Sequence, residues 1–315
     1  MLEKIEEIIT VHFIIVIAVG FVIGFSFQDL SGFLNPYIIP ILMIVMYFSF
    51  LRIDAEIFME EVKKYVVNLY LCFLTVIIVP VVIFYLCLIV LKLFSLHESW
   101  AIGPLILFLS PTSALSVTFT IILKGKFERA LLNLVLTSFI APFSMPFLLR
   151  FLAGSYVEID FYRMMGLLSL IIAIPFVLSR INGIFFPAVK RALLPHLSSA
   201  SIILLTLVEI GALEGFRSFA LEKPSGFFGS IALSIFVLMS AYALGWVLAG
   251  SKNPVDRITV TLLTTWPNLG LPIGIANTFF REDMPNVFFF LVVMVLPWHI
   301  SIAFPKWISR RHSLR

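Results

Sequence analysis

Apolar stretches about as long as a lipid bilayer is thick recur along the whole chain, separated by short polar segments. A spanning helix needs about 20 predominantly apolar residues, and ten stretches approach that length. They lie near residues 9–27, 36–52, 66–91, 101–123, 129–151, 162–181, 196–219, 226–249, 258–280 and 285–305. The pattern predicts an all-α membrane protein with ten transmembrane helices.

The composition argues against the main soluble classes of protein. Of the 315 residues, 61% are hydrophobic and 13% are charged, whereas a soluble protein carries about 25% charged residues. So few charges cannot cover a soluble chain of this size, and we expect neither a soluble enzyme nor a nucleic-acid-binding protein. The first ten residues carry three glutamates and one lysine. Because that charge is wrong for a secretory signal, we expect no cleaved leader.

The basic residues predict an orientation. Ten crossings place both termini on one side of the membrane. That side carries 16 lysines and arginines and the opposite side carries 6, which together make the 22 of the chain. The positive-inside rule therefore predicts cytoplasmic termini in a multi-pass protein of the cytoplasmic membrane. The net charge of +4 needs no acidic partner, because the anionic lipid surface of the bilayer attracts these basic loops.

The ten spans divide into two sets of five, residues 1–155 and 156–315. An odd number of crossings inverts the second half relative to the first. Pro36 and Pro195 open the second span of each half, and Pro111 and Pro267 interrupt the fourth, so both pairs are separated by about half the chain. Paired interrupted helices in inverted halves are typical of secondary transporters. The alternative is that these prolines are scattered, as membrane helices tolerate.

The fourth and ninth spans contain residues that do not favour a continuous helix. Five serine and threonine residues lie between Thr112 and Thr120, directly after a proline, and the ninth span holds two prolines and two glycines in eleven residues. Freed backbone groups must face protein or water within a membrane. We therefore expect two broken, crossing helices that line a cavity, although kinks satisfied by neighbouring helices are the alternative. The expected helix breaks are Pro111, Pro267, Gly270 and Pro272.

Several motifs resemble those of one transporter family. They are residues 46–53 (MYFSFLRI), Ser116 to Gly125, Ala141-Pro142, Asn268 to Leu271, and Trp298 to Ser301. Together they resemble the bile acid:sodium symporter family, whose wider superfamily includes arsenite exporters and auxin efflux carriers. The resemblance implies an alternating-access carrier for a small organic anion, built as a single unit of two inverted five-helix repeats. The first break lacks the cysteine of the arsenite exporters, which argues against arsenite as substrate.

The resemblance also implies where sodium would bind, and most of those positions lack an oxygen ligand here. The family's serine is kept as Ser116. Its asparagine, serine, threonine, glutamate and two glutamines fall on Val117, Ala130, Leu134, Leu263, Pro267 and Thr75. Sodium is a hard cation that prefers several oxygen ligands. We therefore expect weak or absent sodium dependence and no cofactor, with Ser116, Thr120 and Thr75 as residual candidates for a sodium site.

Two ionisable residues inside spans are candidates for coupling transport to another ion. Glu209 lies deep in the seventh span and could carry a proton, because a carboxylate inside a membrane is costly unless it has a function or a partner. The alternative is a structural pair with Arg217, two turns along. His299, in the tenth span, is a second candidate, with a packing role as the alternative.

The uncharged polar residues at the two breaks are the expected substrate-binding residues: Thr112, Ser113, Ser116, Thr120, Thr264, Thr265 and Asn268. No lysine or arginine lies among them, so helix dipoles or a cotransported cation would have to meet the charge of an anion. The chain has no phosphate-binding loop and no His-Glu-x-x-His motif, so we expect neither ATP-driven transport nor an enzyme. The alternatives are an ion-independent carrier similar to auxin carriers, a proton-coupled carrier using Glu209, and a non-transporting membrane sensor. The sequence leaves open the substrate, the direction of transport and the oligomeric state.

Overall fold

The computed structural model describes residues 12–53, 63–251 and 253–302. Over these ranges the chain is helical and contains no β-strand, only one isolated bridge between two backbone segments. The all-α prediction is confirmed for this part of the chain. The first ten residues, and the outer ends of the predicted spans 9–27 and 285–305, lie outside the described residues.

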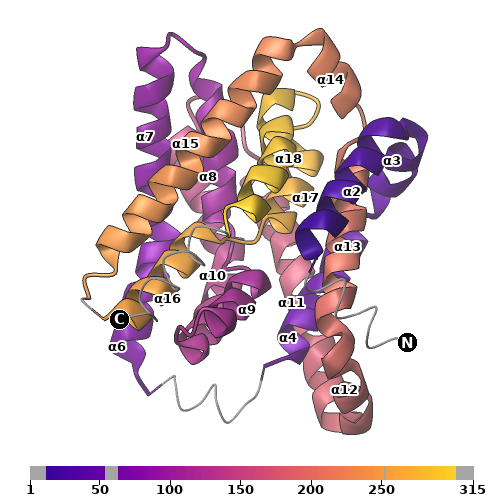
Figure 1. Ribbon diagram of the computed structural model, residues 1–315, viewed down its shortest axis with the longest axis vertical. Helices are drawn as coiled ribbons and strands as arrows, with labels where there is room; N and C mark the ends of the chain where they lie inside the picture. Colours follow the sequence, from indigo (N-terminus) through magenta and orange to yellow (C-terminus); the bar gives the residue numbers. More distant parts are fainter. Residues whose placement is uncertain (1–11, 54–62, 252, 303–315) are drawn as a thin grey trace. The chain divides into compact units, whose positions relative to one another are not determined.

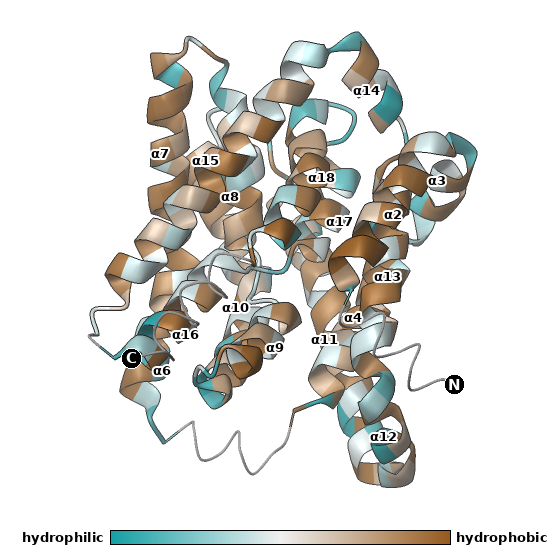
Figure 2. Ribbon diagram, in the orientation of Figure 1, coloured by the Kyte–Doolittle hydropathy of each residue, from teal (hydrophilic) through white to brown (hydrophobic). Residues whose placement is uncertain are grey.

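Within the described ranges, six helical segments are long and apolar enough to cross a membrane, judged by length and composition. They are Gln28–Leu51, Tyr65–Leu93, Phe127–Ala153, Phe161–Phe185, Pro187–Ala212 and Pro224–Leu248. Apolar residues dominate α7 (Val79–Leu93), whereas polar residues are more frequent on α12 (Pro187–Leu193) and α14 (Phe216–Glu222) (Figure 2). These six segments match six of the ten predicted spans. The remaining helices are shorter.

The chain divides into two compact units. Unit 1 consists of residues 1–53 and 167–228, and unit 2 consists of residues 54–166 and 229–315. Each unit therefore takes one segment from each half of the sequence. The units do not coincide with the predicted halves 1–155 and 156–315. A repeat relates two stretches of sequence, and it does not require each half to pack by itself.

In unit 1, α13 (Leu197–Ala212) packs against α2 (Phe13–Ser26), α3 (Gln28–Leu34) and α4 (Ile38–Leu51) (Figure 1). Two glycines of α2 allow a close approach. A Cβ atom on Gly20 would overlap the methyl group of Thr206, and one on Gly24 would lie 3.1 Å from the Cα atom of Ile210. Glycines one turn apart let two helix backbones approach closely, so α2 and α13 form a tight pair.

The second span of each half has the same three-part form. A helix of seven residues, α3 or α12, leads into a 3₁₀ turn that contains a proline, and the turn leads into α4 or α13. The two turns are η1 (Asn35–Tyr37) with Pro36 and η4 (Leu194–His196) with Pro195. Proline suits the first positions of a helical turn because its missing N–H has no partner to lose there.

In unit 2 a buried centre is formed by α8 (Ile102–Leu109) and α18 (Pro285–Ile300). All eight residues of α8 are buried, and so are residues 287–295 of α18. Further helices of this unit are α6 (Tyr65–Phe73), α7, α9 (Ala114–Ile122), α10 (Phe127–Ala153), α16 (Pro254–Thr265) and α17 (Gly270–Phe279) (Figure 1). A wider π turn, η2 (Leu74–Ile78), joins α6 to α7, and a 3₁₀ turn, η3 (Glu98–Ala101), precedes α8. Two helices, α11 (Phe161–Phe185) and α15 (Pro224–Leu248), contain the boundaries between the units.

Candidate functional site

Two helical spans of unit 2 are interrupted, and the interruptions lie against each other. The first runs from residue 110 to residue 113, between α8 and α9, and the second from residue 266 to residue 269, between α16 and α17. Thr112 and Pro267 face each other as an isolated antiparallel bridge. The N–H of Asn268 donates to the carbonyl of Pro111 at 2.7 Å, and the N–H of Ser113 donates to the carbonyl of Trp266 at 3.1 Å. The two interruptions thus satisfy part of each other's backbone. We call this region the crossing.

The first interruption follows from its local sequence. A proline disfavours the helical conformation in the residue before it, and Ser110 is extended, with ψ at 153°. Ser113 is also extended and its hydroxyl accepts the N–H of Leu115 at 3.0 Å, which is an N-cap for α9. The Ser110 hydroxyl donates across the crossing to the carbonyl of Asn268 at 2.9 Å.

The second interruption is shorter than the sequence pattern suggests. Trp266, directly before Pro267, ends α16, and the Asn268 side chain accepts the N–H of Leu271 at 3.3 Å near the start of α17. Gly270 and Pro272 lie inside the first turn of α17 and not in the interruption. The first N–H groups of a helix have no partner within that helix, so a proline is tolerated there without breaking it.

Hydroxyl and amide groups support the first interruption. The N–H of Thr112 donates to the hydroxyl of Thr137 at 3.0 Å. The Asn133 amide donates to the hydroxyl of Thr112 at 2.7 Å and to that of Thr75, in η2, at 3.4 Å. Sequence reasoning missed Asn133 and Thr137. Their spacing could have revealed them, because polar residues four apart in an apolar span lie on the same helix face.

Indole groups support the second interruption. The Trp298 Nε1–H donates to the carbonyl of Thr265 at 3.0 Å, and the Trp266 Nε1–H donates to the hydroxyl of Tyr242 at 3.0 Å. The two tryptophan rings stack, with centroids 5.1 Å apart and an angle of 23° between planes. Phe119 of α9 lies edge-on to Trp266 at 4.8 Å. Sequence reasoning did not assign a role to either tryptophan.

The predicted substrate-binding residues fall into two groups. Thr112, Ser113, Thr265 and Asn268 lie in or directly beside the crossing, and the buried hydroxyl of Thr265 has no hydrogen-bond partner within the described ranges. By contrast, three hydroxyls donate to carbonyls of their own chain segment. Ser116 donates to Ser113 at 2.7 Å, Thr120 to Ser116 at 2.7 Å and Thr264 to Val260 at 2.9 Å. What these residues bind stays a prediction.

The positions implied for sodium are largely apolar and packed together. Ala130 and Leu263 belong to one buried hydrophobic cluster with Leu71, Leu74 and Val260, and Val117 packs against that cluster. Ala130, Leu263 and Val117 are three of the positions at which the resemblance implies oxygen ligands. Across the described ranges, no group of three or more histidine, cysteine, aspartate or glutamate residues could hold a metal ion. Apolar side chains offer a hard cation no ligand.

An ionic cluster joins the segment after α9 to the start of α16. The Asp256 carboxylate lies 2.6 Å from the Lys126 ammonium and 3.0 Å from the Arg129 guanidinium. The N–H of Lys126 also donates to the hydroxyl of Thr259 at 2.8 Å. Asp256 precedes the apolar stretch 258–280. The hydrogen bond and charge of Lys126, aided by the charge of Arg129, lower the pKa of Asp256 below its ordinary value.

The two candidates for ion coupling lie in different units. His299, in unit 2, is buried, with its Nδ1 atom 2.7 Å from the carbonyl of Val295 and its ring edge-on to Trp266. Glu209, in unit 1, is 3% exposed, and its Oε1 atom has no hydrogen-bond partner among the described residues. The alternative pairing of Glu209 with Arg217 is wrong. The helix ends at Ala212, and the left-handed Gly215 begins a separate helix that carries Arg217 away as an exposed residue.

Comparison with protein families shows which family the chain resembles. The model of the Sodium Bile acid symporter family matches residues 39–216, which is more than half of the chain. Among curated proteins, none matches the sequence. The matched range includes the first interruption and ends before the second.

Proposed function

Because this chain belongs to the sodium bile acid symporter family, we propose that it is a secondary active carrier of a small organic anion with little or no dependence on sodium. The family match and the apolar helices agree on the general class of protein. The chain is a multi-pass membrane protein of a transporter family. The substrate class, the alternating-access mechanism, the cytoplasmic membrane and the cytoplasmic termini are parts of the proposal.

The proposal includes ten spans in two inverted repeats, and the helix boundaries support it. In the second spans, α3, η1 and α4 begin at residues 28, 35 and 38, and α12, η4 and α13 begin at residues 187, 194 and 197, so one offset relates all three pairs. At the interruptions, a second shared offset relates the end of α8 to the end of α16 and the start of α9 to the start of α17. Scattered prolines would not produce constant offsets between whole elements. Such a repeat with an interrupted helix in each half is typical of secondary transporters.

The crossing supports a binding site for an anion. Both α9 and α17 begin there, and the N-terminus of a helix carries a partial positive charge. The unpartnered hydroxyl of Thr265 adds a donor. We propose Thr112, Ser113, Thr265 and Asn268 as the residues that contact the substrate, with Ser116, Thr120 and Thr264 behind them in the adjoining half-helices. The sequence stretches 101–123 and 258–280 contain no lysine or arginine.

The single observation that carries the weak sodium dependence is the hydrophobic cluster around Ala130 and Leu263. Leu263 and Ala130 occupy positions to which the resemblance assigns a carboxylate and a hydroxyl. Refilling that volume with a hydrated cation would require desolvating the ion without offering it ligands, which is costly. The cluster packs α6, α10 and α16 against one another with apolar side chains, which supports a weak dependence on sodium.

The test begins with ligand-dependent stability. A thermal-shift screen of purified protein against organic anions, including a bile acid, identifies a substrate because ligands that bind the folded state raise its stability. Uptake of that anion into proteoliposomes is then measured with sodium and with sodium replaced by choline. We expect the two rates to agree within about twofold, or about 0.4 kcal/mol. Protein-free liposomes are the control. A collapse of uptake in choline would contradict the proposal.

The same measurements separate the alternatives. Uptake that is insensitive to both sodium and pH gradients would favour an ion-independent carrier similar to auxin carriers. No flux of any anion that shifts the unfolding temperature would contradict a carrier and favour a membrane sensor. We propose the coupled carrier over these, because an unpartnered buried carboxyl group lies in unit 1 and calls for a role of its own.

A further inference from the structure

Glu209 is a buried carboxyl group that the crossing does not use. It lies in α13 of unit 1, is 3% exposed, and its Oε1 atom has no hydrogen-bond partner in the part of the chain that is described. Its other oxygen, Oε2, lies 3.8 Å from the point where a Cβ atom on Gly20 would stand. The carboxyl group therefore sits at the tight contact between α2 and α13, at the place where α2 has no side chain.

None of the titratable groups around this carboxyl forms an ion pair with it in the described part of the chain. Glu209 is the only titratable residue within α13, and α2 contains none from Phe13 to Ser26. The elements packed against α13, with the residues directly before and after them, contribute His12, Asp29, Tyr37, Tyr47, Arg52 and His196. Beyond the end of α13 come Glu214 and Arg217. No ion pair joins Glu209 to any of these groups among the described residues.

Leaving a carboxylate charged and unpaired inside a membrane is costly. The usual solution for an isolated buried carboxyl group is to bind a proton, which removes the charge and adds a hydrogen-bond donor. In the conformation described, the uncharged acid is thus the form that the surroundings of Glu209 favour. A conformation that gave Glu209 access to water would favour the ionised form.

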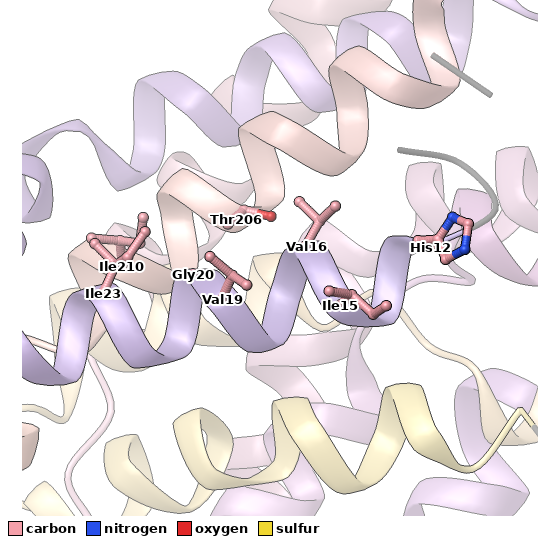
Figure 3. A pocket seen from close by; sticks show the side chains of 8 residues that line it. All are labelled: His12, Ile15, Val16, Val19, Gly20, Ile23, Thr206 and Ile210. Atoms are coloured by element: carbon pink, nitrogen blue, oxygen red, sulfur yellow. The ribbon is translucent and has the colours of Figure 1, made fainter. Parts of the chain in front are cut away.

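An open pocket reaches the neighbours of this carboxyl group. It has a volume of about 670 Å³ and lies between α2 and α13, with Gly20, Thr206 and Ile210 among its lining residues. Figure 3 shows His12 at one end of the pocket, Ile23 and Ile210 towards the other, and Gly20 and Thr206 between them. Gly20 and Thr206 are also the residues that meet at the tight contact beside Glu209. The pocket therefore reaches two residues, Gly20 and Thr206, that lie at the contact beside the carboxyl group.

We propose that Glu209 is the proton-binding site through which this carrier couples transport to the proton gradient. The inference rests on the proposed carrier function. The step is a protonation only: the carboxylate of Glu209 binds one proton to become a carboxylic acid, and releases that proton to water in the other conformation. No other bond changes, and the coupling ion is the proton itself.

The first experiment tests proton binding without any substrate. Infrared difference spectra of the purified full-length protein are recorded between about pH 4 and about pH 9, a range that brackets the ordinary titration of an exposed glutamate. We expect the carbonyl band of a protonated carboxylic acid to persist at neutral pH. The band should be absent in Glu209→Gln and unchanged in Glu222→Gln, which removes an exposed glutamate of the same unit. A neutral-pH band that survives in Glu209→Gln, or no such band in the wild type, would overturn the proposal.

The second experiment tests coupling, using the anion identified by the thermal-shift screen. Glutamine has the shape of protonated glutamic acid, so Glu209→Gln should fold and should retain exchange of labelled for unlabelled anion. Accumulation driven by a pH gradient should fall by about tenfold, within the ordinary range of coupling between two sites. Equal accumulation by Glu209→Gln and wild type would overturn the proposal. If the wild type transports no anion, the carrier function fails, and the infrared experiment still decides whether Glu209 binds a proton.

Discussion

The two interruptions at the crossing have the same length and opposite chemical support. Each is four residues long, one between α8 and α9 and the other between α16 and α17. At the first, the freed backbone group is the N–H of Thr112, which is satisfied by a threonine hydroxyl. At the second, the freed group is the carbonyl of Thr265, which is satisfied by the N–H of Trp298. The type of freed group therefore decides which side chain can support each interruption.

This difference has a consequence for how easily each interruption can rearrange. A hydroxyl both donates and accepts, whereas an indole N–H only donates. The hydroxyls of Thr112, Thr137 and Thr75 can therefore exchange donor and acceptor roles in their hydrogen bonds with each other and with the Asn133 amide. Trp298 has one donor and one large buried ring, so its support is lost entirely if it moves. The first interruption is the adaptable one and the second is the rigid one.

The largest expected effect comes from weakening the rigid side. Trp298→Phe removes the donor to the carbonyl of Thr265 and part of a buried ring that stacks on Trp266. We expect the free energy of unfolding to fall by about 2–4 kcal/mol, because a buried carbonyl loses its partner and a cavity forms. Thermal unfolding in detergent measures it. The matched control is Trp246→Phe, at a half-buried tryptophan of α15, which should cost clearly less. Equal losses would show that the Trp298 hydrogen bond contributes nothing of its own.

A smaller loss is expected on the adaptable side. Thr137→Val keeps the shape of the side chain and removes the hydroxyl that accepts the N–H of Thr112. We expect a loss of about 1 kcal/mol, typical of a side-chain hydrogen bond between membrane helices. Thr278→Val, at an exposed threonine of α17, serves as the control in the same unfolding assay. A loss larger than that of Trp298→Phe would reverse the comparison.

The smallest effect concerns Asp256, which joins the two interrupted spans at their other ends. The pKa of Asp256 is lowered when the protein is folded, first by the hydrogen bond from Lys126. A lowered pKa stabilises the folded protein at pH values above the ordinary carboxyl pKa of about 3.9. That stabilisation is lost as the pH falls through the lowered pKa. We expect wild type to lose slightly more stability on acidification than Asp256→Asn, measured as the unfolding temperature of each at neutral and acidic pH. Parallel pH profiles would show that this cluster contributes nothing to stability.

Much of the architecture could be predicted from local sequence, because a proline acts on its own neighbours. Pro111 and Pro267 indicated both interruptions, and the long apolar stretches indicated the membrane helices. The position of Gly270 was misjudged, since a glycine is compatible with both a break and the first turn of a helix. Arg217 was placed on the helix of Glu209 because helical spacing was extended through Gly215, whose left-handed backbone (φ 72°) precedes a new helix.

The support of the crossing could not be predicted in the same way. Asn133 and Trp298 act on residues 21 and 33 positions away, and such contacts depend on how helices pack, which spacing along one helix does not reveal. The division into two units is also non-local, since each unit combines segments from both halves of the sequence. The apolar cluster around Ala130 and Leu263 was visible only as a loss of sodium ligands. That these side chains pack together in one cluster could be seen only from the folded structure.

The contact between α2 and α13 has a mechanical consequence. Gly20 and Gly24 leave α2 without side chains at this contact, so the Thr206 and Leu213 side chains lie directly against the backbone of α2. A pair of long side chains absorbs a displacement by changing rotamers on both helices, whereas here only α13 has side chains that can adjust. We therefore expect a displacement of α13 to displace α2 as well, so that the two helices move together. Because Glu209 lies at this contact, we expect a change in its charge to affect the position of both helices.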